Sequence, residues 1–141
     1  VVLLGSLLPL ARVMQGSGLD RTLVQTLTAV AGTWPPYAVL IGLYLATALA
    51  TELLSNQAAV TLMLPLALAI GHDLGVAPQA VMGVVTFAAS HSFLTPIGYQ
   101  TNLMVYGPGR YRFLDMTRYG APLTIGLALV VPFLICRYFH L

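Results

Sequence analysis

Three consecutive polar residues, Ser55-Asn56-Gln57, interrupt a long and mostly apolar run from Tyr37 to Gly71. A helix needs roughly 20 apolar residues to cross a bilayer, so an unbroken run of this length would overshoot it. The run therefore predicts two helical arms that meet at a polar tip within the membrane. Non-helical backbone at that depth is tolerated only inside protein or beside a water-filled cavity. Transporters bind their substrates in such cavities near the bilayer midplane.

The composition excludes most soluble classes of protein. Of the 141 residues, 58% are hydrophobic and only 7% are charged, and the mean hydropathy is +0.88. A soluble domain carries about 25% charged residues, so the chain is expected to be an integral membrane protein. Its net charge of +2 comes from scattered arginines and does not suit nucleic-acid binding. Cys136, the single cysteine, excludes an internal disulfide and is expected to serve packing.

The predicted fold class is an all-α integral membrane protein, with transmembrane helices, a re-entrant helical hairpin and a broken helix. The second hairpin arm, 58–70, covers only about 20 Å as a helix, which favours a re-entrant hairpin over two full spans. Residues 19–31 are expected to form a helix in the membrane interface, and the alternative is that they simply continue a membrane helix. The chain starts without methionine inside an apolar stretch, and we expect it to be the C-terminal part of a longer protein. The expected segments are a membrane helix end at 1–14, an interfacial helix at 19–31, the hairpin at 37–71, the broken helix at 79–106 and a last transmembrane helix at 120–139.

The arginines predict the orientation in the membrane. Arg110, Arg112 and Arg118 face a single acid, Asp115, in one polar loop. Cytoplasmic loops carry an excess of arginine and lysine, so this loop is expected on the cytoplasmic side of the plasma (inner) membrane. The hairpin would then enter from the outside, and the C-terminus would emerge outside.

A second interruption, Thr95-Pro96-Ile97-Gly98, is expected at a depth similar to that of the first. Proline lacks a backbone donor and glycine loosens the backbone, so the helix should break there. The arm that begins at the Ser55–Gln57 tip would point its N-terminal amides at the site, and a helix N-terminus favours an anion. Carbonyl groups freed at the end of the first arm suit a hard cation such as Na⁺. The two breaks therefore predict coupled binding of an anion and a cation.

Two ionisable residues near these breaks have open roles. Glu52 shares one helical stripe with Thr51, Ser55 and Asn56, and a charge at that depth costs roughly 2.5–3.5 kcal/mol, so it should be paired or wet. It is expected either to brace the hairpin or to help hold a cation or a proton. His91, four residues before Thr95, is expected to be hydrogen-bonded at a helix contact, with a proton-sensing or anion-binding role as the alternative.

Catalytic interpretations find little support. Ser92, His91 and Asp73 could be assembled into a hydrolase triad, but adjacent residues on a helix pair poorly and no nucleophile elbow is present. The sequence offers no cluster of metal ligands. Gly107-Pro108-Gly109 is expected to be a tight turn, because a phosphate-binding loop would need a lysine and a preceding strand. We expect the chain not to be an enzyme.

The stretches TELLSNQAAVTLMLPLALAIG and SFLTPIGYQTNLMVYGPGRYRF resemble the C-terminal half of the divalent-anion/sodium symporter family, within the wider citrate-transporter-like group. The resemblance covers nearly the whole chain. It implies one of two inverted repeats, a homodimer, an elevator-type movement, and Na⁺ as coupling ion with no other cofactor. The implied partners are a small anion, the lipid bilayer, the N-terminal half of the same transporter and a second copy, with no nucleic acid.

The same resemblance implies roles for individual residues. Gln57 stands where threonine is usual, and the run 99–102 differs from the Pro-Pro-Asn form of dicarboxylate-type members. This run is more similar to members associated with inorganic anions such as sulfate, which favours an inorganic oxyanion over a di- or tricarboxylate. The expected substrate residues are Ser55, Asn56, Gln57, Thr95, Pro96, Thr101 and Asn102. The expected Na⁺ residues are Thr51, Leu54, Asn56 and Leu94, the leucines through their carbonyl groups.

The leading hypothesis is thus a secondary active symporter that moves a divalent or inorganic anion with Na⁺. The alternative within the same wider group is a Na⁺/H⁺ antiporter or an arsenite-type efflux permease. A non-transporting membrane scaffold is the alternative from another class.

Overall fold

The computed structural model describes residues 35–139 of the chain, and the regular secondary structure of this part is all helical, without a β-strand. It confirms the all-α prediction for these residues. The expected helix end at 1–14 and the interfacial helix at 19–31 lie outside the described residues. Within the described range, the helices are α3 (Pro36–Leu53), α4 (Asn56–Asp73), α5 (Pro78–Ala89), α6 (Gln100–Tyr106) and α7 (Phe113–Phe139).

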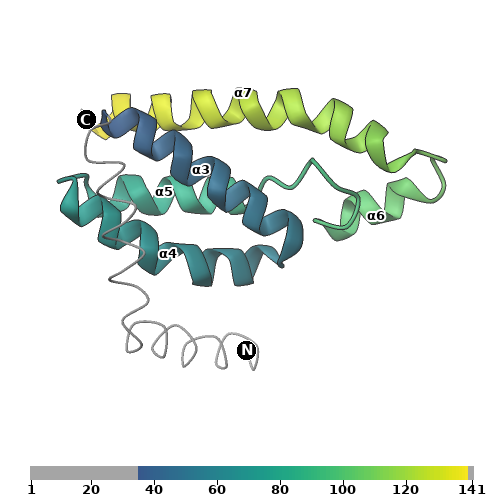
Figure 1. The fold of residues 1–141 in the computed structure, drawn as a ribbon, viewed down its shortest axis with the longest axis horizontal. Helices are drawn as coiled ribbons and strands as arrows, with labels where there is room; N and C mark the ends of the chain where they lie inside the picture. The colour runs from purple at the N-terminus through teal and green to yellow at the C-terminus, as the bar shows by residue number, and fades with distance from the viewer. Residues whose placement is uncertain (1–34, 140–141) are drawn as a thin grey trace.

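Helix α5 lies at the centre of the packing and contacts α3, α4 and α7 (Figure 1). Its buried face repeats at helical spacing and consists of alanine and valine: Ala80, Val81, Val84, Val85, Ala88 and Ala89. Small side chains let helices approach closely in a membrane protein. At Gly71 of α4, an added Cβ would lie 2.6 Å from Val81 Cγ2, so glycine is required there for α4 to pack on α5.

Helices α3 and α4 form a hairpin joined by Leu54 and Ser55 alone. Ser55 is extended and its Oγ accepts a hydrogen bond from Ala58 N (3.3 Å), which caps α4. Asn56 and Gln57 therefore lie in the first turn of α4. The prediction had placed them in a non-helical tip. With 18 residues, α4 extends about 27 Å, longer than the predicted 58–70 arm.

The second interruption is longer than predicted. Helix α5 ends at Ala89, not at Leu94, and irregular backbone follows up to Tyr99, before the seven-residue helix α6. Ser90 Oγ donates to Thr86 O (2.8 Å) at the end of α5. The unwound amide groups find partners on α3, and this stabilises a longer interruption than proline and glycine alone require.

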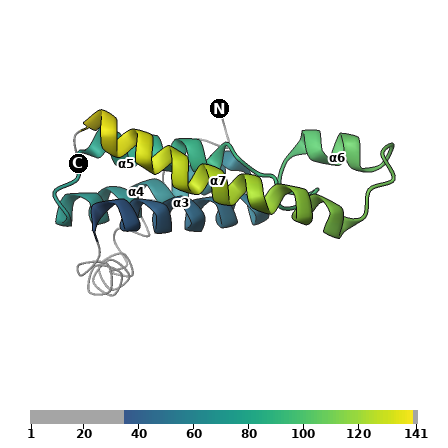
Figure 2. The same ribbon diagram turned by 90° about the horizontal axis from the view of Figure 1, so that it is seen from above.

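Helix α7 begins at Phe113, earlier than the predicted 120, because Asp115 Oδ2 accepts a hydrogen bond from Arg112 N (2.8 Å) and stabilises the first turn. Its N-terminal part and α6 extend beyond the bundle of α3, α4 and α5 (Figures 1 and 2). Among residues 35–139, two helices, α3 and α7, are long and apolar enough to cross a membrane by length and composition. The shorter apolar helix α5 packs against both of them, and α3 and α7 also contact each other directly.

Candidate functional site

A pocket of about 600 Å³ lies where the α3–α4 connection meets the irregular backbone before α6. This volume falls within the range of about 300–1,000 Å³ that small-molecule sites occupy. The structure thus brings the two interrupted stretches of the sequence to one place. The lining residues form two continuous runs: Glu52, Leu53, Leu54, Ser55, Asn56 and Gln57 from the hairpin, and Ile97, Gly98, Tyr99 and Gln100 from the second interruption.

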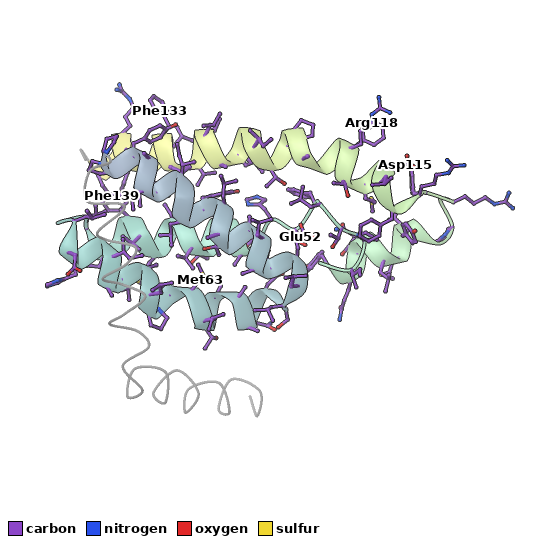
Figure 3. The ribbon with its side chains drawn as sticks, viewed as in Figure 1. Glu52, Met63, Asp115, Arg118, Phe133 and Phe139 are labelled. Atoms are coloured by element: carbon purple, nitrogen blue, oxygen red, sulfur yellow. The ribbon has the colours of Figure 1, made fainter. Side chains whose placement is uncertain are left out.

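Glu52 connects the two interruptions through hydrogen bonds. Its Oε1 accepts a hydrogen bond from Leu94 N (2.8 Å), and its Oε2 accepts from Thr95 N (2.9 Å) and Thr95 Oγ1 (2.7 Å). Glu52 as a whole residue is 8% exposed, and it lies beside the irregular segment (Figure 3). Buried backbone N–H groups need partners, and the unwound segment has no helical carbonyl to offer them. Glu52 supplies these partners from α3.

Glycine is required at position 98 because two oxygen atoms occupy the space next to its Cα. An added Cβ would lie 2.6 Å from Glu52 Oε2 and would overlap Ser92 Oγ. Gly98 N also donates to Thr95 Oγ1 (3.0 Å), which closes a turn over the carboxylate. Ser92 Oγ is buried without a hydrogen-bond partner in the described part of the chain.

Three oxygen atoms of different kinds converge at the end of α3. Thr51 Oγ1 lies 2.8 Å from Asn56 Oδ1 and 3.1 Å from the carbonyl oxygen of Ala89. A hydroxyl carries one proton and cannot satisfy both acceptors fully. A hydroxyl, an amide oxygen and a carbonyl are the ligands that hard cations prefer. Of the predicted Na⁺ residues, Thr51 and Asn56 take part in this group.

The two leucines predicted for the Na⁺ site are placed differently. The carbonyl of Leu94 accepts a hydrogen bond from Thr117 Oγ1 of α7 (2.9 Å). Leu54 lines the pocket and is 40% exposed.

The first turn of α4 forms the polar wall of the pocket. Ser55 Oγ accepts a hydrogen bond from Ala58 N, and Ser55 O accepts one from Ala59 N. The backbone N–H groups of Asn56 and Gln57, at the helix terminus, therefore have no carbonyl of a preceding helical turn to bond. Glu52 is the one charged residue that lines the pocket within residues 35–139, and no basic side chain does so there. The positive potential of this wall therefore comes from the helix terminus.

Four of the predicted substrate residues, Thr95, Pro96, Thr101 and Asn102, are not among the pocket-lining residues. The Thr95 hydroxyl is hydrogen-bonded to Glu52, Pro96 is buried and Thr101 is exposed. Asn102 Nδ2 donates to the carbonyls of Ser92 (2.7 Å) and Thr95 (3.3 Å). Asn102 thus fastens α6 to the irregular backbone.

His91 is not among the pocket-lining residues, and its Nδ1 is hydrogen-bonded to the hydroxyl of the fully buried Tyr44 (3.1 Å). Its ring also lies near that of Phe93, with centroids 5.6 Å apart. The pair joins α3 to the backbone just after α5.

Sequence reasoning identified Thr51 and Glu52 but missed Tyr44 and Thr47, which extend the same buried polar stripe on α3. The four residues have offsets of 0, 3, 7 and 8, a helical signal that was present in the sequence. No local pattern indicates the contribution of Thr117 or of the Ala89 carbonyl. Five further residues line the pocket without having been predicted as site residues: Leu53, Ile97, Gly98, Tyr99 and Gln100.

Comparison with known proteins agrees with the resemblance drawn from the motifs. A family model described as "Sodium:sulfate symporter transmembrane region" matches residues 1–141. The chain is 53% identical over 135 residues to an uncharacterized transporter of Synechocystis, covering 96% of this chain and 22% of that protein. It is 40% identical over 99 residues to sodium/sulfate cotransporter 2 of Chlamydomonas reinhardtii, covering 70% of this chain and 11% of that protein.

A mammalian relative is also similar. The Na⁺/citrate cotransporter of Rattus norvegicus is 31% identical over 131 residues, which cover 92% of this chain and 23% of that protein. The chain thus spans less than a quarter of the length of these relatives. These relatives are named as transporters and not as enzymes. Because the family model matches along the whole sequence, this chain belongs to the sodium:sulfate symporter family.

Proposed function

We propose that the chain forms part of a secondary active transporter that moves a small anion across the membrane together with Na⁺. The observation that carries the proposal is the charge of the pocket. Its described lining contains the acid Glu52, the N-terminus of α4 and no basic side chain. A divalent anion that entered alone would meet the full negative charge of Glu52, which exceeds the partial positive charge of roughly one half at the helix terminus. A cation bound alongside offsets that charge, so the geometry favours simultaneous binding of both ions.

The cation is proposed to bind between Thr51 Oγ1, Asn56 Oδ1 and the carbonyl oxygen of Ala89. These atoms already converge within 3.1 Å of Thr51 Oγ1. In the absence of a cation, Thr51 donates its single proton within this group, and a bound Na⁺ would accept all three oxygens as ligands. The carbonyls of Leu54 and Leu94 remain proposed ligands from the family resemblance, although that of Leu94 is engaged by Thr117.

The anion is proposed to bind at the start of α4, against Ser55, Asn56 and Gln57. All three line the pocket, and the terminal amides of an 18-residue helix favour negative charge at this point. Asn56 is the residue that faces both ions, through its backbone amide and its side-chain oxygen. Thr95, Pro96, Thr101 and Asn102 are proposed to act indirectly, by holding the second wall in place.

Sulfate-like anions are the proposed substrate class, with di- and tricarboxylates as the second candidate. The sequence relatives carry both names, sodium/sulfate and Na⁺/citrate cotransporter. A thermal-shift series with sulfate, phosphate, succinate and citrate, each with and without Na⁺, separates the two classes in the full-length protein. Stabilisation by citrate and succinate alone would overturn the sulfate assignment.

Glu52 is proposed as a brace, because its two oxygens already accept three hydrogen bonds from the opposite wall. His91 is proposed to serve the same purpose through Tyr44. The proton-binding alternative for either residue would show itself as H⁺-coupled transport.

The arrangement of the whole protein extends this proposal. The α3–α4 pair is proposed as a re-entrant hairpin, with the α6–α7 turn in the cytoplasm and the C-terminus outside. The plasma membrane, the N-terminal half of the same transporter and a second protomer are the proposed surroundings.

The decisive variant is Asn56→Ala in the full-length protein, reconstituted in liposomes with a Na⁺ gradient. We expect Na⁺-driven sulfate uptake to fall at least about tenfold, since the substitution removes the side-chain oxygen that is proposed to bind the cation. Gln79→Ala, an exposed position at the start of α5, is the matched control and should transport normally. Unchanged uptake in Asn56→Ala would refute the assigned site. Na⁺-dependent proton flux in anion-free liposomes would instead support the antiporter alternative.

A further inference from the structure

Three arginines gather at the end of the molecule formed by the α6–α7 turn and the start of α7. Arg110 lies in the turn, Arg112 directly precedes α7, and Arg118 lies in its second turn. All three side chains are exposed. This end extends past the helical bundle (Figure 2), and Arg118 points away from it (Figure 3).

Acidic side chains do not neutralise these arginines within residues 35–139. The ion pair found in that part of the chain joins His72 and Asp73, on another element. The nearby acid, Asp115, uses its Oδ2 to accept the backbone N–H of Arg112. The three guanidinium groups therefore present their donors to the surroundings.

Exposed aromatic residues accompany each arginine. Tyr111, Phe113 and Tyr119 directly follow Arg110, Arg112 and Arg118, and they are 46%, 44% and 76% exposed. Tyrosine and tryptophan concentrate at the membrane–water interface, where one end of the ring is apolar and the other is hydrated. These alternating residues place this end of the molecule at the level of the lipid headgroups. The six residues are called the arginine collar below.

The other end of α7 carries a second arginine–tyrosine pair, whose distance from the first can be compared with the thickness of a bilayer. Arg137-Tyr138 repeats the same pair 19 residues after Arg118-Tyr119 and is likewise exposed. That separation is about 28 Å along a helix, close to the roughly 30 Å of a bilayer core. The two pairs thus lie at opposite interfaces. One interface carries three arginines of the described chain, and the other carries one.

We propose that the arginine collar binds the headgroups of anionic phospholipids in the leaflet it faces. A guanidinium offers two parallel N–H donors to a phosphate, and unpaired cations beside a membrane are attracted to anionic lipid. The aromatic rings seat between the acyl chains and the headgroups. The bound lipid holds the start of α7 at a fixed depth. This binding is separate from the anion and Na⁺ sites, because none of these arginines lines the pocket.

The test uses the full-length protein in nanodiscs of phosphatidylcholine, alone or mixed with phosphatidylglycerol, and follows thermal unfolding by intrinsic fluorescence. We expect phosphatidylglycerol to raise the melting temperature of the wild type, with the effect lost at high NaCl. The combined variant R110Q/R112Q/R118Q should show an apparent affinity for phosphatidylglycerol at least about tenfold weaker. R137Q, at the opposite end of the same helix, is the matched control and should keep the full response.

Further arms make each outcome informative. The combined variant R110K/R112K/R118K retains the charge and should retain most of the response, which distinguishes lipid binding from a folding defect. Inorganic phosphate added to phosphatidylcholine nanodiscs should not reproduce the shift. The proposal is overturned if the wild type does not respond to phosphatidylglycerol, if the glutamine variant responds fully, if R137Q loses the response equally, or if free phosphate is sufficient.

Discussion

Glu52 shows how one side chain can define a membrane site. The residue is 8% exposed, and its carboxylate accepts hydrogen bonds from Leu94 N, Thr95 N and Thr95 Oγ1, with distances of 2.7–2.9 Å. Unwound backbone at membrane depth is costly unless protein supplies its partners. Glu52 supplies them and, at the same time, leaves the pocket with a negative charge. The brace and the proposed binding of a cation thus have the same origin.

The Glu52→Gln variant tests the brace. A glutamine side chain has one acceptor oxygen in place of two, so either Leu94 N or the Thr95 groups would lose their acceptor. We expect a loss of about 1–3 kcal/mol in the free energy of unfolding, measured in detergent by thermal or chemical unfolding. Full wild-type stability would contradict the bracing role. Reduced transport at unchanged stability would point instead to direct ion binding.

The Gly98→Ala variant tests the close contact on the other side of the carboxylate. The new methyl group would meet Ser92 Oγ and lie 2.6 Å from Glu52 Oε2, so the Glu52 hydrogen bonds must shift. We expect destabilisation of about 1–3 kcal/mol together with weaker anion binding. Gly126→Ala on α7 is the control, because nothing lies within 4 Å of its added Cβ. Equal effects of the two substitutions on anion binding would contradict the packing described.

At the scale of elements, helix α3 is the scaffold of the site. Tyr44, Thr47, Thr51 and Glu52 occupy one buried face of it, at 0–8% exposure. Thr51 and Glu52 reach the end of α5 and the backbone that follows it, and Tyr44 reaches His91. The irregular segment is therefore held at several points by a single helix. A rigid helix positions the ligands better than a loop could.

The Thr51→Val variant tests the cation site on this face. Valine keeps the shape of threonine and removes the hydroxyl oxygen, so we expect the apparent affinity for Na⁺ to fall about tenfold. Thr47→Val is the matched control, because the Thr47 hydroxyl bonds only its own helix, at Leu43 O (2.8 Å). Affinity is measured as the Na⁺ concentration needed for half-maximal sulfate uptake. The same change in both variants would refute the assignment.

The sequence predicts the elements that local interactions form and fails for those that depend on distant residues. Apolar runs and the polar interruption at Ser55 are local signals, and they predicted helices on both sides of a turn. The predicted length of the second interruption was wrong, because the actual length depends on Glu52, which lies 42 residues before Leu94. The early start of α7 was also missed, although Asp115 in its first turn is a local cap. The Ala89 carbonyl that meets Thr51 and the Thr117 hydroxyl that meets the Leu94 carbonyl come from distant helices and leave no local pattern.

For the molecule as a whole, the described residues present one side of a site. The pocket of about 600 Å³ is lined by two runs of backbone from this chain, and the chain spans less than a quarter of its relatives. The relatives are named as sodium-coupled carriers of sulfate and citrate. In the proposed function, this wall contributes a helix terminus for an anion and converging oxygens for a cation, and the buried acid Glu52 lines the same pocket. Both ions of the proposed coupled pair would then bind at a single wall of the pocket.

The measurement that tests this coupling most directly is equilibrium binding of radiolabelled sulfate to the purified full-length protein, with Na⁺ or with choline as the cation. Binding of the two ions at adjacent positions predicts at least about tenfold tighter sulfate binding in Na⁺, and by linkage the same factor for Na⁺ affinity when sulfate is present. In Thr51→Val the factor should shrink, while in Thr47→Val it should not. Equal sulfate affinity in Na⁺ and choline would contradict the account.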